Sequence, residues 1–281
     1  MKPNESFLDL PKTFWASVRL ISQEVGYTDR KTGQIKVPSD AEISQKLAQF
    51  DIDIDRLQNQ AVSSQRYALL LQQYFEYRAE ILQSFVKPHL MDLEKARKAF
   101  ENTVKNLHPK CPLPKNKQKG EKKTYAYLTC LVNMLVEANA QGVSCDYDPH
   151  QLTTITNDRL PVRTLARRVD GAFPSSVNPI AIWEIKEYYY TTTFGSRVAD
   201  GVYETLLDGL ELEELLEREK IKVLHYLIID AYDTWWNKGK SYLCRIIDLL
   251  HMGLIDEVLV GYEVVERLPS LVSEWVDQMV K

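Results

Sequence analysis

Cysteine is scarce in this sequence, and its spacing excludes a zinc-binding motif. The chain has four cysteines, and none stands in a CxxC pair or beside histidines at the spacing of zinc ligands. Their scatter also argues against a disulfide framework. Long apolar runs are missing as well, so we expect neither a signal peptide nor a membrane span, and we predict a cytoplasmic protein.

An excess of positive charge is also missing. The 281 residues include 35 Lys and Arg against 39 Asp and Glu, which gives a formal charge of −4. This balance excludes a protein that coats nucleic acid through bulk positive charge, so any DNA contact must come from local basic groups. A lysine-rich stretch within residues 105–123 provides one such group, although such stretches are more often solvated loops. Its candidate DNA contacts are Lys117, Lys119, Lys122 and Lys123.

Glycine is absent from residues 64–107, where apolar side chains recur at helical spacing. The pattern predicts a long helical hairpin that is interrupted near Pro88. Two shorter helices are expected before it, one over residues 14–23 and one beginning after Ser39. We therefore expect residues 1–110 to form a mainly helical region that recognises DNA or mediates dimerisation, with plain packing as the alternative.

Residues 111–123 contain two prolines and a glycine among the lysines, which indicates a mobile linker. From residue 124 onward the pattern alternates between helices and apolar strands. Helices are predicted over residues 124–140, 196–218 and 242–251, and strands over residues 162–172, 180–188 and 223–231. This order predicts an α/β core over residues 124–281, with a mixed central sheet flanked by helices.

Three charged residues stand out because they fall on or beside the predicted strands. Alternate residues of a strand share a face, so Glu184 and Lys186 project together, and Asp170 lies near the end of the neighbouring strand. Buried charges need a partner or a metal ion. Two carboxylates form a hard oxygen site of the kind that binds Mg²⁺, and a nearby ammonium stabilises charge on a phosphate. The pattern therefore indicates cleavage of phosphodiester bonds.

These residues resemble the motif of the PD-(D/E)xK nuclease superfamily, to which most type II restriction endonucleases belong. Asp170 matches the first acid, Glu184 the second and Lys186 the lysine, while Val169 stands where the family has its name-giving proline. The resemblance covers about residues 124–263. It implies a restriction-endonuclease-like core in this part of the chain.

The resemblance also implies a fourth catalytic residue and a metal cofactor. Glu137, on the helix that precedes the strands, would complete the set with Asp170, Glu184 and Lys186. The three acids would bind Mg²⁺, for which Mn²⁺ can substitute. The implied activity is sequence-specific cleavage of double-stranded DNA, as in a type II restriction enzyme. A homodimer would place two such sites across a palindromic duplex.

Three arginines are further candidate DNA contacts. Arg197 falls at the start of a predicted helix, and Arg163 and Arg168 lie on the predicted strand that carries the first acid. For Arg197 the alternative is an ion pair with Asp200 or Glu204 on its own helix.

Other functions are compatible with the same residues. One is a metal-dependent nuclease that acts on RNA or branched DNA, because the site recognises a phosphodiester rather than a sugar. Another is a catalytically inactive regulator with a nuclease-like fold that binds DNA. A purely structural interpretation also stays open, in which Glu184 and Lys186 form an exposed ion pair on a surface strand.

Overall fold

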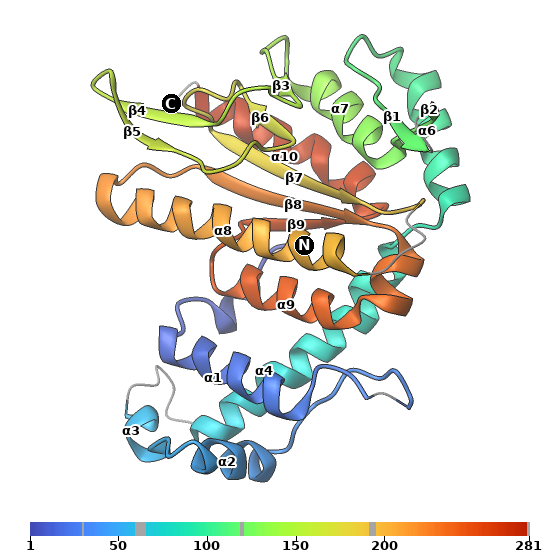
Figure 1. Cartoon of the computed structure of the whole chain (residues 1–281). Coiled ribbons are helices and arrows are strands. Elements are labelled where there is room, and N and C mark those ends of the chain that lie inside the picture. The colour runs from blue at the N-terminus through green and yellow to red at the C-terminus, as the bar shows by residue number, and fades with distance from the viewer. Residues whose placement is uncertain (30, 60–65, 119–120, 191–194, 280–281) are drawn as a thin grey trace.

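The structure is a computed structural model that describes residues 1–29, 31–59, 66–118, 121–190 and 195–279. Its elements form an α/β part around a central sheet and, next to it, a group of helices from the first third of the chain (Figure 1). The catalytic residues predicted from the sequence, Glu137, Asp170, Glu184 and Lys186, belong to the α/β part.

The central sheet is mixed. In the described part of the chain its five strands lie in the order β3 (Asp146–Tyr147), β6 (Gly171–Phe173), β7 (Ala181–Glu187), β8 (Leu224–Asp230), β9 (Glu257–Val260). The first three pair antiparallel, and β8 and β9 continue the sheet in parallel with β7. β7 and β8 are central and rich in buried β-branched and aromatic residues, as such strands must be. The predicted strands over residues 180–188 and 223–231 are thus confirmed.

Helices cover both faces of the sheet (Figure 1). One face packs against α6 (Leu93–Leu107), α7 (Tyr127–Asn139) and α10 (Glu263–Met279), and the other against α8 (Ser196–Glu219) and α9 (Lys240–His251). Alternation along β7 divides its side chains between the two layers, because Ala181 and Trp183 join the first and Ile182 joins α8. The predicted fold class, a mixed sheet flanked by helices, is confirmed.

The described part of the N-terminal region is mainly helical. It contains η1 (Glu5–Phe7), α1 (Lys12–Val25), α2 (Asp40–Gln49), α3 (Ile54–Gln58) and α4 (Tyr67–Ile81), which share a separate apolar core. The chain then continues through η2 (Leu82–Val86) and α5 (Lys87–His89). The helical course breaks at residues 90–92, close to Pro88 as predicted, and α6 joins the α/β part by packing on α7. A short helix, η3 (Asp233–Lys238), follows β8.

Two predicted elements are wrong in their extent. The strand expected over residues 162–172 is divided into β5 (Leu160–Thr164), which pairs with β4 (Thr154–Asn157), and β6. Between β5 and β6 the chain passes from the β4–β5 hairpin to the central sheet. Leu165 and Val169 in this segment are buried. Alternating apolar residues alone do not reveal such a change of partner strand.

The helix expected from Thr124 begins only at Tyr127. Thr124 lies in β2 (Glu121–Tyr125), which pairs with β1 (Lys115–Gln118), so the segment expected to be a linker forms a hairpin in its described part. Its prolines precede the hairpin and do not interrupt the pairing. Lysines suit a short two-stranded hairpin because they discourage pairing with other chains.

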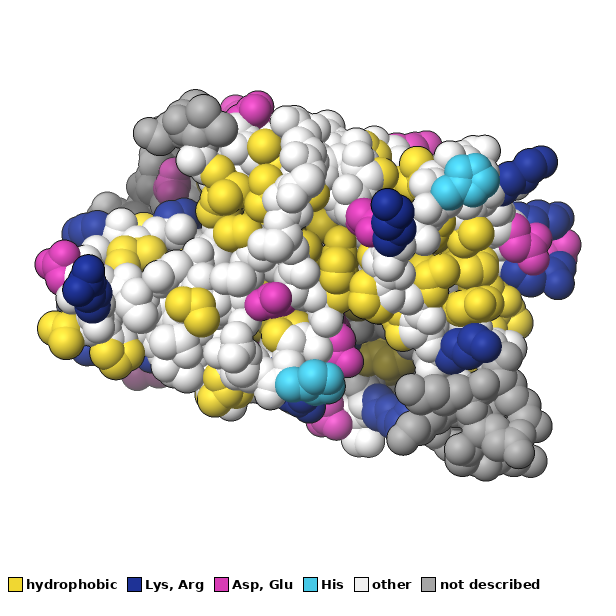
Figure 2. Space-filling view, turned by 90° about the horizontal axis from the view of Figure 1, so that it is seen from above, with side chains coloured by type: hydrophobic (Ala, Val, Ile, Leu, Met, Phe, Trp, Pro, Cys, Tyr) yellow, Lys and Arg dark blue, Asp and Glu magenta, His cyan; other side chains and the backbone are white. Residues whose placement is uncertain are grey.

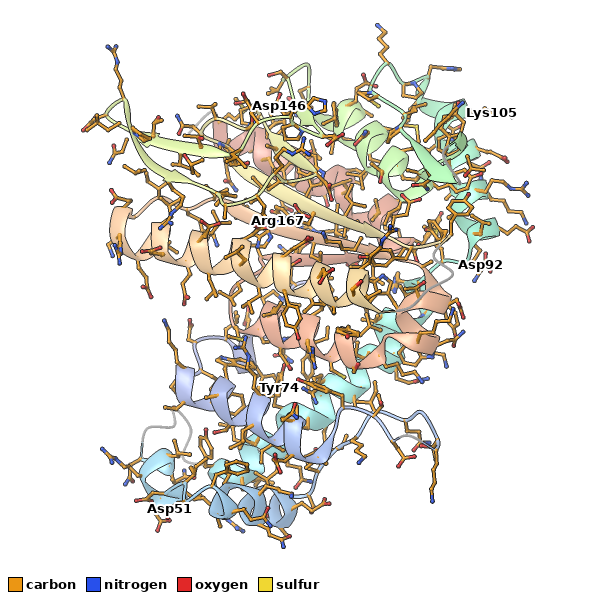
Figure 3. All side chains as sticks on the ribbon, viewed as in Figure 1. Asp51, Tyr74, Asp92, Lys105, Asp146 and Arg167 are labelled. Atoms are coloured by element: carbon orange, nitrogen blue, oxygen red, sulfur yellow. The ribbon has the colours of Figure 1, made fainter. Side chains whose placement is uncertain are left out.

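A buried ion pair connects the N-terminal helices to the α/β part. Arg78 on α4 places Nη1 3.0 Å from Oδ1 of Asp248 on α9, and the Tyr74 hydroxyl donates to the same oxygen at 2.7 Å. Figure 3 labels Tyr74 at this junction. Both charged side chains are at most 5% exposed. Because burial removes water from both charges, each depends on the other for compensation.

Replacing Arg78 with methionine should therefore lower the free energy of unfolding by about 3–5 kcal/mol, since it leaves Asp248 buried without a countercharge. Urea unfolding measures the change. The matched control is Lys98→Met, which removes an exposed pair with Glu94 and should have a much smaller effect. Equal losses in the two variants would contradict the structural role of the buried pair.

Candidate active site

Asp170 and the Glu184–Lys186 pair meet because β6 and β7 are neighbours. Asp170 directly precedes β6, and its backbone N–H donates to the carbonyl of Trp183 at 3.1 Å. Its carboxylate Oδ2 accepts from the backbone N–H of Ile185 at 2.7 Å. Glu184 and Lys186 alternate with these residues on β7, and the Lys186 Nζ lies 2.9 Å from Glu184 Oε2. The structure thus brings together the acid, acid and lysine that the sequence indicated.

Gly171 allows the two strands to approach in this way. A Cβ atom at this position would lie 2.1 Å from the indole ring of Trp183, its partner on β7. The Trp183 ring in turn stacks on Trp275 of α10, with 5.7 Å between the ring centroids. The register of β6 and β7, which places Asp170 beside Glu184, therefore depends on glycine at position 171.

Three further charged residues, which the sequence analysis did not select, complete the cluster. Arg167 lies between the sheet and α8 (Figure 3), with Nη1 2.8 Å from Glu184 Oε1 and 2.7 Å from Asp208 Oδ2. Lys186 Nζ also lies 2.7 Å from Glu204 Oε2. Glu204 and Asp208 are four residues apart on α8, a spacing that presents both to β7. That spacing, on the helix after the Glu184 strand, was the signal available in the sequence.

Burial makes full ionisation of this cluster difficult. Burial raises the pKa of Asp170 to about 7, and the neighbouring Glu184 carboxylate adds to the rise. Burial also raises the pKa of Asp208 to about 7, although Arg167 opposes the rise. Lys186 keeps its proton, because the surrounding carboxylates raise its pKa more than burial lowers it. The cluster thus contains four carboxyl groups that share two cationic side chains.

A cavity of about 470 Å³ opens beside Asp170 on the other side of β7. Asp170 is the residue of the cluster that reaches it, while Glu184 and Lys186 face α8. The walls come from the segment around β1, from α7, from the loop after β3 and from β7. They are formed by Pro112, Pro114, Lys115, Asn116, Ala126, Thr129, Asn133, Tyr147, Asp148, His150, Asp170 and Ile185.

The structure does not bring Glu137 to the other acids. Its carboxylate accepts from the backbone N–H of Lys110 at 2.9 Å and lies near the Cys111 thiol. Asn133, one turn earlier on α7, reaches the cavity instead. Within the residues that the structure describes, no three His, Cys, Asp or Glu side chains are grouped closely enough to hold a metal ion.

The candidate arginine contacts lie in different surroundings. Arg168 is exposed and places Nη1 3.3 Å from Nδ1 of His150, at the edge of the cavity. Arg197 is exposed at the start of α8, where its carbonyl accepts from the Tyr188 hydroxyl. Arg163 instead forms ion pairs with Glu211 and Glu214 of α8.

The candidate lysine contacts belong to the hairpin of β1 and β2. Lys117, Lys122 and Lys123 lie on its strands, but their side chains are outside the described part of the structure, and Lys119 lies outside it entirely. Elsewhere on the face seen from above, the Lys and Arg side chains that are drawn occur as separate groups (Figure 2). This distribution agrees with the absence of bulk positive charge.

Glu187, the last residue of β7, supports the wall of the cavity from behind. Its Oε2 accepts from the backbone N–H and the hydroxyl of Thr129, both at 3.1 Å, and Asn116 approaches its other oxygen. Burial raises the pKa of Glu187 to about 7, although the hydrogen bonds from Thr129 oppose the rise. Thr129 and Asn116 are thus held by a carboxyl group that is difficult to ionise.

Two family models match the chain. One, described as Domain of unknown function (DUF7687), matches residues 91–275, and the other, described as Domain of unknown function (DUF7690), matches residues 1–85. The second match ends within η2 and the first begins after α5, close to the break in the helical course. No curated protein and no solved structure matches the chain. None of the helices in the described ranges has the length and apolarity needed to cross a bilayer.

The variant Gly171→Ala should lower the free energy of unfolding by about 2 kcal/mol or more, because the added methyl group overlaps the Trp183 ring. Combining it with Trp183→Leu should recover part of this loss, since the shorter side chain leaves room. Urea unfolding of the wild type, the two single variants and the double variant measures the coupling. Losses that simply add would contradict the proposed contact.

The variant Glu187→Gln should remove a pH dependence of stability. Between the ordinary value of 4.5 and about 7, the folded chain keeps the Glu187 proton while the unfolded chain loses it, so wild-type stability falls as pH rises. The stability of the variant relative to the wild type should therefore grow by up to about 1.4 kcal/mol per pH unit in this window. Urea unfolding across the window measures it, and a constant difference would contradict it.

Proposed function

This chain belongs to the DUF7687 family, and we propose that it is a metal-dependent endonuclease that hydrolyses phosphodiester bonds in double-stranded DNA. The observation that carries the proposal is the meeting of Asp170 with Glu184 and Lys186 on two adjacent strands, beside an open cavity. Two acids and a lysine in this arrangement agree with the resemblance to PD-(D/E)xK nucleases. The proposal includes a restriction-endonuclease-like core and sequence-specific cleavage, as in a type II restriction enzyme.

The donor set is compatible with Mg²⁺ or Mn²⁺ as the cofactor. Asp170 and Glu184 would hold the ion, and two carboxylates suffice because Mg²⁺ keeps several of its water ligands. Glu184 Oε1 and Asp208 Oδ1 are buried without a hydrogen-bond partner of favourable geometry, although Arg167 lies within 2.8 Å of the former. Asp208 Oδ1 therefore keeps its capacity to accept, whereas Glu184 Oε1 is already paired with Arg167. When bound, the ion supplies an acidified water and positive charge for the phosphate.

The surrounding side chains have distinct roles in this proposal. Lys186 stays protonated between Glu184 and Glu204, and its ammonium stabilises the negative charge that develops on the phosphate. Asp170 is the residue of the cluster that reaches the cavity, from which the substrate would approach the cluster. Arg168, exposed beside His150 at the cavity edge, is placed to contact the DNA backbone.

A homodimer is part of the proposal, because two copies related by a twofold axis cut both strands of a palindromic site. Light scattering of the protein, free and on a cleavable duplex, tests this part by itself. A mass of one chain in both states would remove it without affecting the single-site chemistry.

Arg167 favours a second candidate function, a catalytically inactive DNA-binding regulator. Its guanidinium contacts both Glu184 and Asp208 and so occupies part of the space between the acids. A protein of this kind would bind DNA without cutting it, with or without added metal.

The variants Asp170→Asn and Lys186→Met should each lower the rate of cleavage by about 100-fold or more, because each removes one charge of the proposed site. DNA binding should persist in both. The assay incubates a large mixed DNA with Mg²⁺ and sequences the ends, with single-stranded DNA and RNA tested in parallel. The matched control is Asp158→Asn, which changes an exposed turn residue with a positive φ that asparagine tolerates.

Cleavage at full rate by either site variant would contradict the assignment of the catalytic residues. Binding without cleavage by the wild type would favour the regulator. Cleavage confined to RNA or branched DNA would overturn the choice of duplex DNA as substrate.

A further inference from the structure

The cavity beside Asp170 has chemistry that the cleavage of a phosphodiester does not by itself require. Its volume of about 470 Å³ falls in the range of pockets that enclose small organic ligands. Apolar wall comes from Pro112, Pro114 and Ile185, and the Tyr147 side chain adds an aromatic group. A phosphate group alone would neither fill this space nor use these walls.

Polar groups in the cavity are held in place before any ligand enters. The buried Asn133 donates from Nδ2 to the Pro112 carbonyl at 2.9 Å, which fixes its amide group. Glu187 holds Thr129 and Asn116 from behind. The amides of Asn116 and Asn133, from β1 and α7, therefore reach the same cavity in defined orientations.

The charges separate the inside of the cavity from its edge. Asp148 and Asp170 belong to the wall, and the backbone N–H of Asp148 donates to the Asp170 carbonyl at 2.9 Å. Asp148 is exposed, and the half-buried carboxyl group of Asp170 disfavours an anion inside the cavity. The exposed Lys115 and Arg168 lie at or beside the edge, where they favour one. A ligand that fits this distribution has a neutral flat part and an anionic group outside it.

We propose that the cavity takes the base of one unstacked nucleotide next to the phosphodiester that is cut. A nucleobase is flat and neutral, and its edge offers donors and acceptors that asparagine side chains pair with. The base matches the apolar walls and the amide groups inside the cavity. The phosphate matches the basic edge. The preferred substrates are then duplexes in which one nucleotide leaves the stack at small energetic cost, including mismatched sites.

This inference rests on the proposed nuclease function, but binding of a nucleotide tests it without cleavage. Saturation-transfer NMR on the full chain, without added metal, uses the four deoxynucleoside 5′-monophosphates as probes. Base protons should receive more saturation than sugar protons. Asn116→Ala and Asn133→Ala should each weaken binding by roughly tenfold, which corresponds to the loss of one or two hydrogen bonds.

Two controls make the result specific. Asn157→Ala, at an exposed position of β4, should bind like the wild type. Deoxyribose 5-phosphate, which lacks a base, should bind far more weakly than the nucleotides. Circular dichroism checks that the buried Asn133→Ala variant is folded, and the half-buried Asn116→Ala variant provides an independent measurement.

Binding of deoxyribose 5-phosphate as tightly as a nucleotide would overturn the inference, as would unchanged binding by the folded asparagine variants. Absence of nucleotide binding at millimolar concentration would overturn it too. Such results would leave the cleavage assay unaffected. Conversely, nucleotide binding by a wild type that never cuts DNA would retain the pocket and reject the nuclease.

Discussion

The carboxylates that are buried between β7 and α8 need cationic partners. The arrangement of the candidate site follows from the positions of the two cationic side chains that pair with them. Arg167 contacts Glu184 and Asp208, while Lys186 contacts Glu184 and Glu204. Gly201 on α8 leaves room for this arrangement, because a Cβ there would lie 3.2 Å from the Lys186 side chain. With the neighbouring Asp170 the cluster still holds more acids than bases. In the proposed function, a bound cation compensates these additional acids.

The two faces of β7 present different side chains to different surroundings. Glu184 and Lys186 point toward α8 and carry the charges, whereas Ile185 and Glu187 lie on the side of α7 and the cavity. Asp170 connects the two sides, since its carboxylate bonds to the backbone of β7 and also reaches the cavity. A strand of alternating side chains can thus hold a charged cluster on one side and a binding wall on the other.

The N-terminal helices meet the α/β part through polar as well as apolar contacts. Arg78 and Asp248 form a buried pair across the junction, and Asp230 at the end of β8 accepts from the backbone N–H of Met91. Buried pairs are sensitive to geometry, so they favour one relative position of the elements that they connect. The position of the helical region relative to the sheet is therefore specified by particular side chains.

Local pattern predicted much of the fold and part of the site. Strong periodicity identified α8, β7 and β8, and the alternation along β7 placed Glu184 and Lys186 on one face. It failed between residues 165 and 170, where the chain passes from one sheet to another, and at Thr124, which is a strand residue. In both places the conformation depends on which strand the segment pairs with. The pattern of apolar residues along the segment does not identify that partner strand.

The amino-acid sequence by itself determined which residues of β7 share a face, because strand alternation is a local property of the backbone. Only the tertiary structure decided that Arg167 and Asp208 join these residues while Glu137 lies apart. It also decided that a cavity opens at Asp170. Contacts between elements depend on how helices pack across the sheet, and that packing involves residues far apart along the chain.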